Sequence, residues 1–256
     1  MLKRTLNIVT ICLCVIASFA QEDKELKSYV NSLKHFTAAS SHKDHGLKYY
    51  LKFLRNGDAT DFFFKGFRSE ACENIASIYE SQKQYLKAIA YYDSADTKYS
   101  NDFIHCGNGA FALQIQRKCK TAKCYLALSE HQNAFSILTP YMFDPLAFNL
   151  DSSETNFYID LMKQLYTNEQ AKKELSDGIE NMAYSYHFEP GPDSTTRLLY
   201  VNCKLSVFGD EVEQAGYFVY VKSDDEAKEK LSWNSKESFT RYIKEQLTIY
   251  RKIQEL

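Results

Sequence analysis

Apolar side chains recur every three or four residues over most of the chain, which is the spacing of one face of an α-helix. This pattern predicts helices over residues 22–37 and 46–55, the second of them ended by an Asn-Gly pair. Two more helices are predicted over 154–166 and 167–183, the latter opening with a capping box. The protein is therefore predicted to be mainly α-helical.

The hydrophobic period shortens to two residues after about residue 182. Apolar and polar side chains alternate in residues 184–188 and 199–207, as on a half-buried β-strand, and residues 217–221 form a third candidate strand. A final helix, capped within residues 234–237, carries its apolar side chains on one stripe: Phe239, Tyr242, Ile243, Leu247, Tyr250 and Ile253. We expect this helix to cover a three-stranded antiparallel sheet. Alternatively, residues 197–222 form one more helical hairpin.

Small residues stand at regular places in the segment 69–102. Ala76 and Ala88 are 12 positions apart, and Tyr79 and Tyr92 stand three and four residues after them. Small side chains let two helix backbones approach closely, while aromatic rings fill the space beside them. The spacing predicts a close antiparallel pair of helices.

This pattern resembles the tetratricopeptide repeat (TPR), a unit of about 34 residues made of two antiparallel helices. The resemblance implies a solenoid of degenerate, TPR-like helix hairpins of a secreted bacterial type. The flanking helices at 22–55 and 154–183 would then be degenerate repeats or caps, because each repeat buries its apolar face only against its neighbours.

A second repeat fits the sequence in two registers. Ala110 and Ala122 keep the strict period of 34, whereas Ala122 and Ala134 keep the spacing within one repeat. The glycines at 107 and 109 favour the second register, because two glycines inside a helix cost together about 2 kcal/mol relative to alanine.

This register predicts the elements of the second repeat. We expect a loop near 101–108, a helix over 109–129 and its partner over 132–143, which Pro140 kinks or ends. With these elements, the predicted domains are a TPR-like helical domain at 21–181 and a small α+β region at 182–256.

The first 20 residues have the pattern of a cleavable signal peptide. Lys3 and Arg4 precede an apolar run of about a dozen residues, and Ser18 to Ala20 supply the small residues of a cleavage site. The run is shorter than the roughly 20 residues that cross a bilayer. We expect cleavage after Ala20, and a mature protein that is periplasmic, secreted or on the cell surface, with no integral membrane segment.

Charge and cysteine content narrow the possible functions. The formal net charge of −2 lacks the basic excess that matches nucleic-acid phosphates, so no nucleic-acid partner is expected. Five of the seven cysteines follow the signal peptide, and most are expected to be small buried apolar residues: Cys72, Cys106, Cys119, Cys124 and Cys203. A bridge from Cys106 to Cys119 or Cys124 is an alternative.

Two short segments could carry chemistry. His42, Asp44 and His45 would be zinc ligands if a fourth group joined them, and His105 with Cys106 would be a nucleophilic element if a base and an orienting partner lay beside them. The sequence contains no Gly-rich phosphate loop, nucleophile elbow or His-Glu-x-x-His motif. We therefore expect no enzyme activity, no cofactor and no metal.

The TPR resemblance points to a partner-binding groove, which in that family is lined by the first helix of each repeat. Carried onto this chain, it implies eight groove residues: Glu70, Glu73, Asn74, Ser77, Glu80, Gln116, Lys123 and Ala127. The glutamates would repel a C-terminal carboxylate, so a bound peptide is expected to be basic or mixed in charge. Alternatively, they are a solvated helix face.

The sequence thus predicts a non-catalytic scaffold of the bacterial cell envelope or secreted space that binds a protein or peptide segment. The alternative is an enzyme or metal-dependent factor with its site near His42 and His45 or near His105 and Cys106. Self-association is a further possibility, because terminal repeats with apolar outer faces tend to pair.

Overall fold

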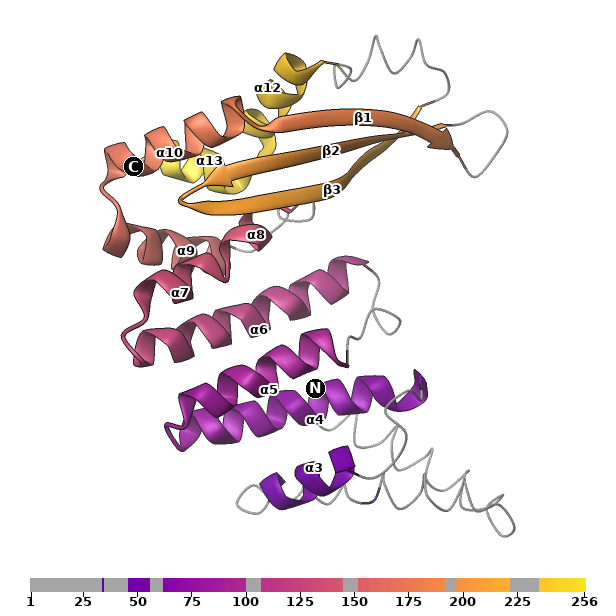
Figure 1. Cartoon of the computed structure of the whole chain (residues 1–256), viewed down its shortest axis with the longest axis vertical. Helices are drawn as coiled ribbons and strands as arrows, with labels where there is room; N and C mark the ends of the chain where they lie inside the picture. The colour runs from indigo at the N-terminus through magenta and orange to yellow at the C-terminus, as the bar shows by residue number, and fades with distance from the viewer. Residues whose placement is uncertain are drawn as a thin grey trace. The chain divides into compact units, whose positions relative to one another are not determined.

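The computed structural model describes Lys34 and residues 46–55, 62–99, 107–144, 152–191, 197–221 and 235–256. The described chain is mainly helical and has a small three-stranded antiparallel sheet in its C-terminal region, as predicted (Figure 1). Contacts within the chain group it into two compact units, residues 1–128 and 129–256. No helix in the described ranges is both long and apolar enough to cross a membrane.

The first unit contains the helices α3 (Gly46–Arg55), α4 (Phe62–Ser81), α5 (Tyr85–Thr97) and α6 (Gly107–Ala127). Helix α3 has the bounds predicted from the sequence. Of the helix predicted at 22–37, only Lys34 is described, and it is helical; the rest lies outside the described residues.

Helices α4 and α5 form the predicted close antiparallel pair. A three-residue turn joins them, in which Lys83 takes a positive φ of 59°. Ala76 and Ala88 are completely buried, and both pack in one cluster with Tyr92 and Cys124. The small side chains therefore lie where the two backbones come closest, as the alanine spacing predicts.

The turn between α4 and α5 has a second copy further along the chain. Gln84 has φ/ψ of −92°/61° and Glu130 has −95°/64°, and each follows a residue with positive φ, Lys83 or Ser129. Ala76 and Ala122 are 46 positions apart, as are Ala88 and Ala134, and all four alanines are completely buried. The helical pattern therefore recurs after 46 residues, which agrees with the second of the two registers.

Two details of this second repeat differ from the prediction. Helix α6 begins at Gly107, so residues 107 and 108 are helical and not part of a loop. Glycine is tolerated there because the amides of the first helical turn have no intrahelical partner. The predicted helix over 132–143 is two helices, α7 (His131–Ser136) and α8 (Thr139–Met142), because Pro140 in the first turn of α8 lacks the N–H that would continue α7.

The second unit contains α7 and α8, the helices α9 (Ser152–Leu165) and α10 (Asn168–Glu180), and the sheet. Helix α10 begins with the predicted capping box, in which the side chains of Thr167 and Gln170 each accept a hydrogen bond from the other's backbone N–H. Since these four helices belong to the same compact unit as the sheet, the unit boundary at 128/129 differs from the domain boundary predicted at 181/182.

The sheet has the order β1-β2-β3, with β1 (Ala183–Pro190), β2 (Arg197–Val207) and β3 (Asp210–Val221) antiparallel to their neighbours. Alternate residues of β2 from Leu199 to Val207 are buried, as the two-residue period predicts. The alternative of a helical hairpin at 197–222 is wrong. Phe208 and Gly209, both with positive φ, form the tight turn to β3, which starts well before the predicted 217.

The predicted final helix is also divided, into α12 (Lys236–Gln246) and α13 (Thr248–Gln254). Ser235 caps α12 by accepting a hydrogen bond from the Ser238 N–H. Leu247 between the two helices is extended, with φ −69° and ψ 113°, and is only 1% exposed. The break lets Leu247 and the α13 residues Ile249 and Ile253 all reach the core. In one continuous helix, Leu247 and Ile249 would lie on nearly opposite faces.

Helix α10 lies very close to strand β2 at Gly178. A methyl group at this position would lie 2.5 Å from the carbonyl oxygen of Ser206 and still closer to the Val207 side chain. Both obstacles belong to β2, the central strand, which is paired on both sides, so Gly178 allows the close approach of helix and sheet.

We therefore expect Gly178→Ala to lower the free energy of unfolding by about 2 kcal/mol or more, as overpacking does. In a helix free of such contacts the same change stabilises by about 1 kcal/mol. The sign of the change in unfolding free energy therefore shows whether α10 packs closely on β2 at this position. Urea denaturation measures it, with the exposed Glu174→Ala in the same helix as control. A stabilised Gly178→Ala protein would contradict the close packing of α10 on β2.

Candidate functional site

The predicted groove residues of α4 lie along one side of the helix. Glu70, Glu73, Ser77 and Glu80 are spaced by three, four and three positions, which places them above one another. Ser77 is exposed and the three glutamates are partly buried; Asn74, next to Glu73, is partly buried as well.

The predicted groove residues of α6 form a similar row. Gln116, Lys123 and Ala127 are exposed, and the partly buried Lys120 stands between Gln116 and Lys123 at helical spacing. We call the α4 and α6 rows together the α4–α6 surface: Glu70, Glu73, Asn74, Ser77, Glu80, Gln116, Lys120, Lys123 and Ala127.

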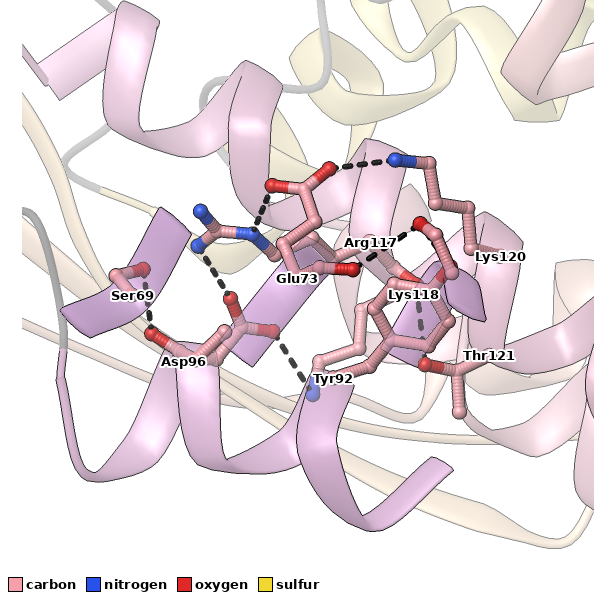
Figure 2. A network of polar contacts seen from close by, with 10 residues as sticks. Ser69, Glu73, Tyr92, Asp96, Arg117, Lys118, Lys120 and Thr121 are labelled. Atoms are coloured by element: carbon pink, nitrogen blue, oxygen red, sulfur yellow. Dashed lines mark hydrogen bonds and ion pairs between the residues drawn. The ribbon is translucent and has the colours of Figure 1, made fainter. Parts of the chain in front are cut away.

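The two rows meet at Glu73. Its carboxylate oxygens accept one hydrogen bond from Lys120 Nζ at 2.5 Å and another from Arg117 Nε at 3.1 Å (Figure 2). Because both partners are on α6, these ion pairs link the α4 row to the α6 row at Glu73.

Arg117 also joins α6 to α5. Its side chain is 5% exposed, and a terminal guanidinium nitrogen donates to Asp96 Oδ1 at 3.1 Å. Lys118 Nζ lies 3.3 Å from the other oxygen of Asp96, whose side chain is 3% exposed. Figure 2 shows Arg117 between Glu73 and Asp96, so one guanidinium links all three helices.

Burial makes this cluster sensitive to the loss of any one charge. Moving a charge out of water costs several kcal/mol, and only a close partner of opposite sign offsets that cost. Burial raises the pKa of Glu73, but hydrogen bonds and charge from Lys120 and Arg117 outweigh it, so the pKa is lowered overall. Glu73 is therefore held as a carboxylate.

The pKa of Glu70, one turn before Glu73, is raised and not lowered. Burial is the main cause that raises its pKa, the charge of Glu73 adds to it, and Arg117 offsets it only in part. Glu70 is thus the carboxylate of the α4–α6 surface that its surroundings compensate least.

The far end of the α4 row is tied to α5 through Tyr92. The Tyr92 hydroxyl donates to Glu80 Oε2 at 2.9 Å and lies 3.2 Å from the Ser77 hydroxyl. Lys120 Nζ lies 5.8 Å from the centre of the Tyr92 ring, a cation–π contact. Glu80 and Ser77 therefore both contact the hydroxyl of a buried ring, while Ser77 itself is exposed.

Four residues of this cluster were not predicted from the sequence: Asp96, Arg117, Lys118 and Lys120. Charged residues on a helix are ordinarily assigned to solvent, and Arg117 and Lys118 stand next to each other, so the three-dimensional arrangement was needed to see their burial. Lys120 had a usable signal, since it completes the helical spacing between Gln116 and Lys123.

The residues considered for chemistry fall into two groups. His42, Asp44, His45, His105 and Cys106 lie outside the described residues. Cys72, Cys124 and Cys203 are buried free thiols, and Cys119 is partly buried. Burial raises the pKa of Cys72 and Cys203 to about 12 and that of Cys124 to about 11, so these three stay protonated and are poor nucleophiles.

No group of three or more His, Cys, Asp or Glu side chains in the described part of the chain is placed to hold a metal ion. Comparisons of the chain with protein-family models, with curated proteins and with solved structures found no match. The TPR resemblance therefore stays a prediction from the alanine and tyrosine spacing.

Removing the charge of Arg117 tests the cluster. Arg117→Met keeps most of the side-chain volume and leaves Asp96 and Glu73 without the guanidinium, so we expect the free energy of unfolding to fall by about 3–5 kcal/mol. Urea denaturation of the full chain measures the loss. The exposed Gln116→Met on the same helix is the control and should change stability by less than about 0.5 kcal/mol. Equal effects of the two changes would show that the buried ion pairs contribute little.

The two neighbouring glutamates should respond to pH with opposite signs. The lowered pKa of Glu73 means that its contribution to stability is present at neutral pH and is lost as the pH falls through the folded-state pKa. The raised pKa of Glu70 means that its ionisation weakens the folded state as the pH rises.

We therefore expect Glu73→Gln to destabilise the protein at pH 7 and Glu70→Gln to stabilise it. Stability measured by denaturation between about pH 3 and pH 8 should show both differences shrinking towards the acid end, where all carboxyl groups are protonated. Glu70→Gln and Glu73→Gln with the same sign at pH 7 would contradict this assignment.

Proposed function

We propose that the chain is a non-catalytic interaction scaffold that binds an extended protein or peptide segment on the α4–α6 surface. The observation that carries the proposal is the ion pair from Lys120 to Glu73, backed by the buried Arg117, which links the α4 row to the α6 row. Side chains that are already held in place lose little entropy when a partner binds, so Glu73 and Lys120 are preorganised.

The charges of this surface support a partner of mixed charge with at least one basic residue. Lys120 and Arg117 neutralise Glu73, and Glu80 accepts a hydrogen bond from Tyr92. Glu70, which is least compensated, would gain from a cation brought by the partner. The α6 row adds a further basic side chain, the exposed Lys123, which favours an acidic residue in the partner.

The setting that we propose is the periplasm, the secreted space or the cell surface. This part rests on the signal-peptide pattern of the first 20 residues alone.

A random peptide display library selected on the purified chain tests the proposal. Enriched peptides should carry a basic residue, with or without acidic neighbours, and should bind more weakly as salt is added. Gln116→Trp places a bulky ring on the α4–α6 surface and should weaken binding by about tenfold or more. Ala90→Trp, at an exposed position of α5, is the matched control and should leave binding unchanged. Peptides that bind Gln116→Trp as well as the parent chain would contradict the proposed surface.

A further inference from the structure

Strand β1 is an edge of the sheet and has an unusually regular backbone. All eight of its residues pair with β2 without a shift in register, from Ala183 opposite Lys204 to Pro190 opposite Arg197. Among the described residues, its backbone forms ladder pairs with β2 alone. Every second residue of an edge strand directs its N–H and C=O outward, which makes a flat edge a template for another strand.

The opposite edge, β3, has the features that normally prevent such pairing. The register between β2 and β3 shifts near Val201 and Asn202, so β3 contains an irregularity of the β-bulge type. The exposed carboxylates Glu211 and Glu213 stand on β3, and both features disfavour the approach of a second strand. Strand β1 has no register shift, and its carboxylate and its proline, Glu189 and Pro190, both stand at its end and leave the middle of the edge unprotected.

The charged side chains of β1 are few. No residue from Ala183 to Tyr186 is charged, and the strand's one carboxylate, Glu189, lies 3.2 Å from the His187 ring. In an antiparallel pair of two copies the two Glu189 side chains lie towards opposite ends, so their charges do not meet.

Strand β1 also carries a row of aromatic rings. The ring centres of Tyr184 and Tyr186 are 6.1 Å apart, as are those of Tyr186 and Phe188. Tyr186 is 43% exposed, and in the described part of the chain the only other large apolar side chain so exposed is Leu86, in the first unit. An exposed ring in the middle of an edge strand needs a partner surface to leave water.

We propose that β1 pairs antiparallel with β1 of a second copy of the chain, centred on Tyr186, so that the two sheets form one continuous sheet. A two-fold axis at Tyr186 places Tyr184 opposite Phe188 and Ser185 opposite His187 of the other copy. Aromatic residues then face aromatic residues on one side of the joined sheet and polar residues face polar residues on the other. The register is self-complementary, as a closed dimer requires.

This inference does not depend on the α4–α6 surface, since β1 and that surface belong to different units of the chain. Light scattering behind size-exclusion chromatography, run over a wide concentration series, tests it. We expect the full chain to reach about twice the mass of one chain. Tyr186→Lys should weaken dimerisation by about tenfold or more, because a charge in the middle of an edge strand opposes pairing. Glu211→Lys, on the β3 edge, is the control and should dimerise like the parent. Circular dichroism confirms that each variant is folded.

A cross-linking experiment checks the register. Tyr186→Cys should form an intermolecular disulfide on mild oxidation, because the two central Cα atoms would lie about 4.5–5.5 Å apart. Glu189→Cys should not, because its two copies would be separated by roughly 20 Å, six residues of extended strand. A parent chain that stays monomeric at every concentration, or a dimer unaffected by Tyr186→Lys, overturns the proposal. So does cross-linking that is equal at the two positions.

Discussion

A buried guanidinium links three helices of the first unit of this protein. Arg117 lies between Glu73 of α4 and Asp96 of α5, with 5% of its side chain exposed. A buried cation is stable only where anions meet it at hydrogen-bond distance, and those anions are in turn stable only while the cation is present. The ion pairs therefore favour the arrangement of the three helices in which these charges are satisfied.

This constraint also decides what the surface above it offers to a partner. An isolated α4 would present three glutamates in a row and would attract basic ligands strongly. With Lys120 and Arg117 on Glu73, and with the Tyr92 hydroxyl on Glu80, only Glu70 remains poorly compensated. The expectation of a basic or mixed partner thus becomes more specific: one cationic residue near Glu70, and neutral or acidic residues towards the α6 row.

The sequence was a good guide wherever local rules decide the structure. The alanine spacing predicted the α4–α5 hairpin, the segment from Thr167 to Gln170 predicted a cap, and the two-residue period predicted β2. Each of these follows from contacts between residues close in the chain or from one repeated face.

The sequence was a poor guide where distant residues decide. In the sequence, Arg117 and Lys118 look like surface residues. Their burial depends on Asp96, about 20 positions earlier, which lies beside them only in the folded chain. In the sequence, Leu247 continues the apolar stripe of one helix. In the structure it has extended backbone angles, separates α12 from α13 and is buried in the core. The sequence allowed two registers for the second repeat. The shared turn geometry of Gln84 and Glu130 favours the register in which equivalent alanines are 46 residues apart.

The most direct test of this account is a double-mutant cycle between Asp96 and Arg117, with unfolding free energies measured for the parent, Asp96→Asn, Arg117→Met and the double variant. If the two charges depend on each other, the double variant should be less destabilised than the sum of the single ones, by about 1–3 kcal/mol. Effects that simply add, within about 0.5 kcal/mol, would show that the buried ion pair does not organise the three helices.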